Sequence, residues 1–138
     1  MSTPSLLRRL GSLLYDTLVF IALWLLASAL FTTIYGSVAE SWQRWLLQLF
    51  CLAVISSYFL WCWTHGGQTL AMRTWRIHLI DASGSAPSLS AAVKRCLLAT
   101  VGLLLGGIGL WWALLDRNGQ FLHDRLAGTR LVMSEKIP

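Results

Sequence analysis

The sequence predicts an all-α membrane protein: a small helical bundle of about three hydrophobic segments with a short, β-prone cytoplasmic loop. Hydrophobic residues make up 56% of the 138 positions and charged residues only 12%, whereas about a quarter of a soluble domain is charged. The apolar residues gather in three segments of about 20 residues, the length of helix that crosses a bilayer core. The formal net charge of +5 on so apolar a chain indicates a cytoplasmic membrane edge and not a nucleic-acid binder. We expect one domain over residues 1–138.

The first segment, residues 15–35, begins beside an acidic residue, Asp16. Its aliphatic and aromatic residues each favour insertion by about 0.3 to 0.6 kcal/mol, against a cost of about 3 kcal/mol for an aspartate at the bilayer centre. Asp16 stands near the segment end, where this cost is smaller, so we expect insertion. The alternative is a signal peptide cleaved near Ala27-Ser28-Ala29. A second span that follows at once argues against cleavage.

The second segment, residues 45–63, is followed by a basic loop at residues 64–95. Arg8 and Arg9 precede the first segment, whereas the connection between the two segments holds a single arginine beside a glutamate. The positive-inside rule therefore places the N-terminus and the 64–95 loop in the cytoplasm of a multi-pass protein. The basic residues of the loop are Arg73, Arg76, Lys94 and Arg95. Ordinary topology explains them, and the alternative is binding of anionic lipid heads or a protein partner.

The third segment, residues 96–115, leaves two paths open. Its glycines at 102, 106, 107 and 109 could form a close-packing face in a straight span. They could equally break the helix into a re-entrant hairpin, which is tolerated where it is buried against protein. A straight span sends the tail to the opposite side of the membrane. The basic residues of the tail, Arg117, Arg125, Arg130 and Lys136, favour a cytoplasmic tail.

Two short stretches outside the segments have strand character. Residues 75–79 alternate apolar and polar side chains, and residues 129–133 are also β-prone. Residues 81–88 are rich in Gly, Ser and Pro and predict a turn, and a helix is expected to start at 90–95. The two β-prone stretches can pair only if the tail lies on the same side as the loop.

Few residues predict covalent chemistry. Cys51, Cys62 and Cys96 have no pairing pattern and are expected to pack as small apolar side chains. His65, His78 and His123 do not have metal-ligand spacing. Nucleophile-elbow, phosphate-loop and metalloprotease patterns are also absent from the sequence. We therefore expect neither a metal nor another cofactor, and no enzymatic activity. A membrane enzyme would have to use His123 and Asp124 as an acid–base pair.

Charges beside the membrane are the candidate functional residues. Arg9 and Asp16 lie about two helical turns apart and so share a helix face; Asp124 is the third. Each has a structural interpretation: a snorkelling anchor for Arg9, a helix-start carboxylate for Asp16 and a solvated helix-start charge for Asp124. The functional hypothesis joins them in one cluster that exchanges a proton or cation.

Three stretches that contain these charges resemble the RDD family of integral membrane proteins, named for one arginine and two aspartates. The stretches read RLGSLLYD at 9–16, GGQTLAMRTWR at 66–76 and LHDRLAGT at 122–129. By this resemblance Arg9, Asp16 and Asp124 are the three named residues. The accompanying motif residues are Gly67, Gln68, Thr69, Arg73, His123, Arg125, Gly128 and Thr129. Ala71, where glycine is frequent, and His78, where a basic residue is common, depart from the family pattern.

The resemblance implies a bacterial inner-membrane protein, and some members of the family have been linked to sodium–proton exchange. We therefore expect a small cation–proton exchanger or transport component in the lipid bilayer. Three short spans rarely enclose a pathway, so this function needs a homo-oligomer. The alternative is a non-catalytic membrane assembly or partner-binding module, in which the charges hold the helices together and orient the 64–95 loop.

Overall fold

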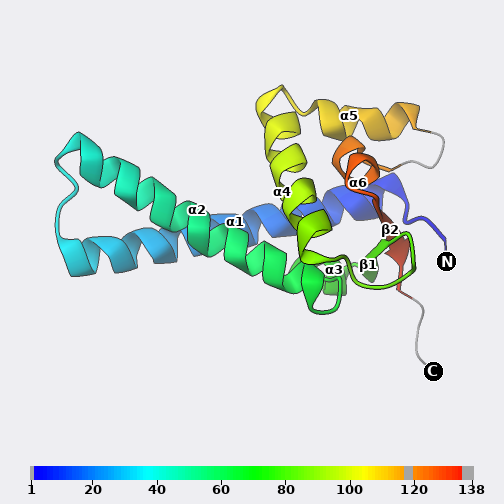
Figure 1. The fold of residues 1–138 in the computed structure, drawn as a ribbon, viewed down its shortest axis with the longest axis horizontal. Helices are drawn as coiled ribbons and strands as arrows, with labels where there is room; N and C mark the ends of the chain where they lie inside the picture. Colours follow the sequence, from blue (N-terminus) through cyan, green and yellow to red (C-terminus); the bar gives the residue numbers. More distant parts are fainter. Residues whose placement is uncertain (1, 117–119, 135–138) are drawn as a thin grey trace.

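The computed structural model describes residues 2–116 and 120–134. Within them the elements follow in the order α1 (Leu6–Tyr35), α2 (Ser41–Thr64), α3 (Leu70–Thr74), β1 (Ile77–Asp81), α4 (Leu89–Leu104), α5 (Ile108–Leu115), α6 (Leu122–Leu126) and β2 (Thr129–Met133). Figure 1 shows that α1 and α2 form a long hairpin, and that the later elements gather at the end of the hairpin opposite its turn. We call α3, β1, α6 and β2 the cap.

The α1–α2 hairpin accounts for the first two predicted segments. Both helices are long and apolar enough to cross a membrane, and only 11% and 17% of their most apolar stretches are buried within the protein. Apolar side chains that are not buried within the protein are suited to contact with lipid. A helix is also suited to a bilayer because its backbone N–H and C=O groups form hydrogen bonds with one another. The turn begins at Gly36, with a φ of 81°, and a capping box of Glu40 and Gln43 starts α2. The expected small helical membrane protein is confirmed.

Helix α1 begins at Leu6, well before the predicted segment, because the Ser5 side chain caps it by accepting from the amide of Arg8. Asp16 consequently lies inside the helix. The helix-start interpretation of Asp16 is wrong, because the macrodipole acts only near the first turn.

The cap contains the predicted strand pair. Strands β1 and β2 are antiparallel, with Leu79 opposite Leu131 at the centre of the register. The first strand begins at Ile77 and not at Trp75, because Trp75 ends α3 and Arg76 turns the chain with a φ of 56°. The amide of Met133 also donates to the carbonyl of Ser2 at 2.9 Å. The tail therefore returns to the side of the 64–95 loop and of the N-terminus, as its basic residues suggested.

The third predicted segment is not one straight span. Ser88 caps α4, which therefore starts at Leu89, and the chain turns at Gly106 and Gly107, whose φ angles are 84° and 79°. Such left-handed angles suit glycine and end a helix. Helix α5 then leads back toward α6 (Figure 1). Of the basic tail residues that suggested this path, Arg117 and Lys136 lie outside the described residues.

The apolar core joins the end of the hairpin to the cap. It comprises Trp63, Met72, Ile77, Leu79, Ala92, Phe121 and Leu131. These residues come from α2, α3, β1, α4, β2 and the segment before α6, so one cluster ties distant parts of the chain together. The charged residues of α1, α4 and α6 lie beside this core.

Candidate functional site

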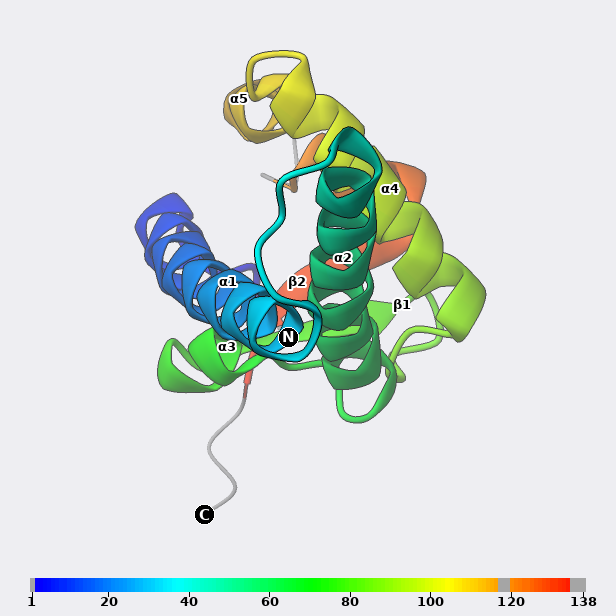
Figure 2. The same ribbon diagram turned by 90° about the vertical axis from the view of Figure 1, so that its left-hand side faces the viewer.

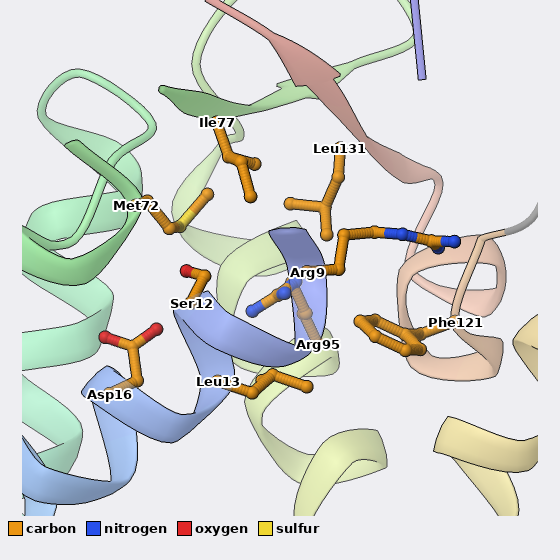
Figure 3. Close-up of a pocket in the computed structure, with 9 residues that line it drawn as sticks. All are labelled: Arg9, Ser12, Leu13, Asp16, Met72, Ile77, Arg95, Phe121 and Leu131. Carbon is orange, nitrogen blue, oxygen red and sulfur yellow. The ribbon is translucent and has the colours of Figure 1, made fainter. Parts of the chain in front are cut away.

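A small cavity lies where α1 meets the cap. Its volume of about 20 Å³ is enough for one water molecule. Figure 3 shows the residues that line it: Arg9, Ser12, Leu13, Asp16, Met72, Ile77, Arg95, Phe121 and Leu131. The lining thus combines two arginines, a carboxylate and a hydroxyl with apolar side chains. A water molecule at such a place needs two to four polar partners, and the lining provides them.

Arg9 is buried inside the protein, with 4% of its surface exposed. Its guanidinium carbon lies 5.0 Å from the centre of the Phe121 ring, over which it extends in Figure 3. Asp124 and Asp116 are close enough to attract it electrostatically. Its Nε and Nη1 atoms are buried and make no hydrogen bond within the described residues. The interpretation of Arg9 as a snorkelling interface anchor is therefore wrong.

Asp16 faces the cavity from the next turns of α1. Its Oδ1 atom is buried and has no hydrogen-bond partner in the described parts of the chain. The Thr69 side chain lies within hydrogen-bonding reach of the carboxylate, and Arg95 attracts it. A buried polar atom without a partner is costly, so Oδ1 is a place where a water molecule, a proton or an ion would be stabilised.

Asp124 is fully buried and is held by Arg95. The Arg95 Nε donates to Asp124 Oδ1 at 2.5 Å, and 7% of the Arg95 side chain is exposed. The Arg95 guanidinium carbon also lies 4.3 Å from the centre of the Trp63 ring. The solvated interpretation of Asp124 is therefore wrong. We call Arg9, Asp16, Arg95 and Asp124 the charge cluster.

The role of Arg95 is not evident from the sequence. It stands just before an apolar segment, where a basic residue ordinarily reports topology, and its partner lies 29 residues further along the chain. Because this pair buries Arg95, it is not among the loop cations that face outward. Arg73, Arg76 and Lys94 are exposed.

His123 borders the charge cluster. Its ring stacks on Phe121, with 5.4 Å between ring centres, and its Nε2 lies 3.7 Å from Asp124 Oδ1. Burial lowers the pKa of His123 to about 4; the charge of Asp124 opposes this shift and that of Arg95 adds to it. The imidazole is therefore neutral at pH 7.

The motif residues of the 64–95 loop place α3 beside α1. A Cβ on Gly67 would stand 2.3 Å from the carbonyl oxygen of Leu79, and the φ of Gly67 is 68°, so only glycine fits there. Gln68 Nε2 donates to the carbonyl of Ile77 at 2.8 Å. Thr69 caps α3 by accepting from the amide of Met72. These contacts bring the Thr69 side chain to Asp16.

The motif residues of the tail place α6 and β2. The Thr129 hydroxyl donates to the carbonyl of Asp124 at 3.2 Å, and Gly128 provides a φ of 72° just before the strand. Arg125 is exposed and its Nη1 donates to Asp116 Oδ1. Arg73, by contrast, is exposed and does not line the cavity.

Gln120 is a second residue that sequence reasoning missed. Its side chain both donates to the carbonyl and accepts from the amide of Leu131, at 3.3 and 3.0 Å. It thus continues the sheet pattern at β2 and fixes the segment before α6. A lone glutamine beside an apolar stretch carries no local signal of this role.

The cluster brings the three named charges together through Arg95. Asp16 and Asp124 come from opposite ends of the sequence, and Arg95 is close enough to attract both. Within residues 2–116 and 120–134, no group of three His, Cys, Asp or Glu side chains could hold a metal ion. The arrangement can hold a proton, a water molecule or a small ion at Asp16, while Arg95 forms an ion pair with Asp124.

Comparison with known proteins places most of the chain in one family. The RDD family matches residues 3–128. An uncharacterised protein of Rickettsia prowazekii (strain Madrid E), RP437, is 34% identical over 84 residues, which cover 60% of this chain and 46% of that protein. The chain thus spans about half the length of this relative. No solved structure matches. The match over nearly all of the chain, including Arg9, Asp16 and Asp124, shows that this protein belongs to the RDD family.

Proposed function

We propose that the chain is a component of a membrane transport system in which Asp16 takes up and releases a proton or a cation. The observation that carries this proposal is the buried, unpartnered Oδ1 of Asp16 beside a water-sized cavity. Asp16 belongs to a helix fit to cross the membrane. Ionisable groups at membrane depth are costly and commonly mark ion or proton pathways.

The other charges have defined parts in this proposal. With Arg9, Asp16, Arg95 and Asp124 all ionised, the formal charge of the cluster is zero. Arg95 stays with Asp124 through its 2.5 Å hydrogen bond, so Asp16 is the carboxylate that exchanges. Arg95 attracts the carboxylate of Asp16, so its positive charge opposes the binding of a proton or cation there and promotes its release. Catalysis of a covalent reaction has no part in the proposal.

The transport pathway must come from more than one copy. Two helices with mostly outward apolar faces do not enclose a polar route, so we expect a homo-oligomer in the membrane. In a bacterial inner membrane, the positive-inside rule places the cap and the charge cluster at the cytoplasmic face. A strictly monomeric protein in nanodiscs of native lipid would count against autonomous transport.

The test uses purified protein in liposomes that enclose a pH-sensitive dye. A pulse of sodium or potassium outside should change the internal pH in the wild type but not in Asp16→Asn. The matched control is Asp81→Asn, because Asp81 ends β1 and its side chain bonds the following turn, away from the cavity. Circular dichroism establishes that each variant is folded. An unchanged response in Asp16→Asn, or none in folded wild type, contradicts the proposal.

A second candidate function is an assembly module, and the exposed basic residues of the loop favour it. Arg73, Arg76 and Lys94 face outward from the cap region, where they would attract anionic lipid heads or an acidic protein surface. The double variant Arg73→Ala with Arg76→Ala should then retain less anionic phospholipid after purification. Wild-type lipid retention and unchanged pull-down partners would exclude this role for the loop.

A further inference from the structure

The second half of α4 and α5 expose an apolar surface that neither the charge cluster nor the hairpin explains. We call residues 97–115 the elbow. The segment lacks Asp, Glu, Lys and Arg. Its exposed apolar side chains are Leu97, Val101, Leu103, Leu104, Leu105, Ile108, Trp111, Trp112, Leu114 and Leu115. Leu104, beside the turn, is 80% exposed. An exposed apolar patch of this kind marks a site of contact with a membrane or a partner.

Both ends of the elbow are held by the rest of the protein. The first half of α4 buries Ala92 and Arg95 against the core and Asp124. At the other end, α5 packs against α6, the helix that carries Asp124. Because Gly106 and Gly107 turn the chain between them, the elbow leaves the cap region and returns to it. It therefore does not carry the chain across a bilayer.

The direction of α4 indicates that this helix lies along the membrane surface. Figure 2, viewed from the turn of the α1–α2 hairpin, shows α4 next to α2 and α5 beyond one end of α4. Figure 1 shows that α4 runs crosswise to the hairpin, whereas α5 runs in the direction of the hairpin, on the side of the cap. If the hairpin crosses the bilayer along its length, α4 lies roughly in the membrane plane, near the end of the hairpin that bears the cap.

We propose that the elbow is a monotopic membrane anchor, which inserts its apolar side chains into the leaflet nearest the cap without crossing the bilayer. Helix α4 packs against α2 and both helices expose apolar side chains, so one lipid phase can cover both. The paired Trp111 and Trp112 suit the interfacial depth at which tryptophan gathers. Interfacial helices bind in proportion to the apolar area that they bury. This inference does not depend on transport.

The test measures the depth of single nitroxide labels in liposomes. Cys51, Cys62 and Cys96 are first replaced by alanine, and single cysteines are then introduced as Leu104→Cys and Val101→Cys. Both positions are exposed, so the fold should tolerate the label. Leu25→Cys on the outer face of α1 is the reference for the membrane interior, and Ser83→Cys in the exposed turn is the reference for water.

Collision rates with oxygen and with a water-soluble nickel complex give the depth. We expect the ratio of oxygen to nickel collisions at Leu104→Cys and Val101→Cys to lie above that of Ser83→Cys and below that of Leu25→Cys. A ratio equal to that of Ser83→Cys would place the elbow in water and overturn the proposal. A ratio equal to that of Leu25→Cys would place the elbow in the membrane interior and would also overturn the proposal of an interfacial anchor. Low collision rates with both reagents, with spin–spin broadening, would show that a second copy covers the elbow.

Discussion

At the scale of single residues, the charge cluster depends on Arg95. Its guanidinium bonds Asp124, stacks on Trp63 and attracts Asp16. A buried ion pair stabilises a protein little more than apolar packing would. Removal of one partner, however, leaves a buried unpaired charge and commonly lowers the free energy of unfolding by about 3 to 5 kcal/mol. Arg95 therefore positions Asp124, whereas Oδ1 of Asp16 has no hydrogen-bond partner among the described residues.

The neighbouring His123 makes stability depend on pH. Its pKa is lowered to about 4 in the folded protein, against about 6.5 for an unperturbed histidine. Between these values the unfolded chain binds a proton and the folded chain does not, so the free energy of unfolding falls as pH falls from about 6.5 to about 4, by roughly 3 kcal/mol. Thermal unfolding followed by circular dichroism in nanodiscs should show this decline, and His123→Gln should reduce its slope.

The groups that face His123 are Asp124 and Arg95, and both remain in His123→Gln. The matched control is His65→Gln, because His65 is exposed at the end of α2. The free energy of unfolding of this variant should depend on pH as steeply as that of the wild type. If the free energy of unfolding of His123→Gln fell as steeply as that of the wild type over this pH range, His123 would not be the group responsible.

At the scale of elements, the short loop before α3 decides where Thr69 meets Asp16. Gly67 allows the loop to touch β1, since the amide of Leu79 donates to the carbonyl of Gly67 at 2.8 Å. The Gln68 side chain adds a bond to Ile77 in the same strand. The strand pair and the loop therefore act as one unit that holds α3 beside α1.

Gly67→Ala should destabilise the protein far more than Gly128→Ala. Both glycines have left-handed φ angles, 68° and 72°, but only Gly67 has a backbone oxygen where the new Cβ would lie. The left-handed conformation costs alanine about 1 to 2 kcal/mol, which is the whole expected effect at Gly128. The clash at Gly67 adds about 1 to 3 kcal/mol. Thermal unfolding of the two variants measures the difference, and equal losses would mean that the loop relaxes away from Leu79.

At the scale of the whole molecule, the α1–α2 hairpin and the returning tail bring Ser2 and Met133 together at one end of the protein. The contact of Met133 with Ser2 and the β1–β2 register require this arrangement. The turn of the hairpin at residues 36–40 is the part furthest from the cap (Figure 1). Asp16, which lines the cavity beside the cap, consequently lies toward the end of the hairpin opposite its turn.

Labelling with a membrane-impermeant maleimide tests this topology in intact cells. In the background without native cysteines, Ser37→Cys at the hairpin turn should react, whereas Ser2→Cys and Ser134→Cys should react only after permeabilisation. The physical reason is that the shared sheet cannot form across a bilayer. Reaction of Ser2→Cys and Ser134→Cys from opposite sides would contradict the arrangement of the cap.

The sequence by itself was enough to predict that this protein resides in a membrane, that it has two long helices and two β-prone stretches, and which family it belongs to. These properties depend on local composition and periodicity, which record where each short stretch lies relative to water and lipid. Arg9, Asp16 and Asp124 could also be singled out, because charges are rare in so apolar a chain. Their individual structural interpretations were wrong, since local pattern does not show whether a charge is buried or solvated.

Only the tertiary structure decided the path of residues 96–115, the side of the tail and the partner of each charge. The glycines of that segment permit both a straight helix and a turn, and the contact between α5 and α6 selects the turn. The Arg95–Asp124 pair joins residues 29 positions apart. The Thr69 side chain reaches Asp16 only because Gly67, which has no Cβ, can lie close to the backbone of Leu79. Such contacts depend on how the whole chain packs, and a linear pattern of residue types does not record that packing.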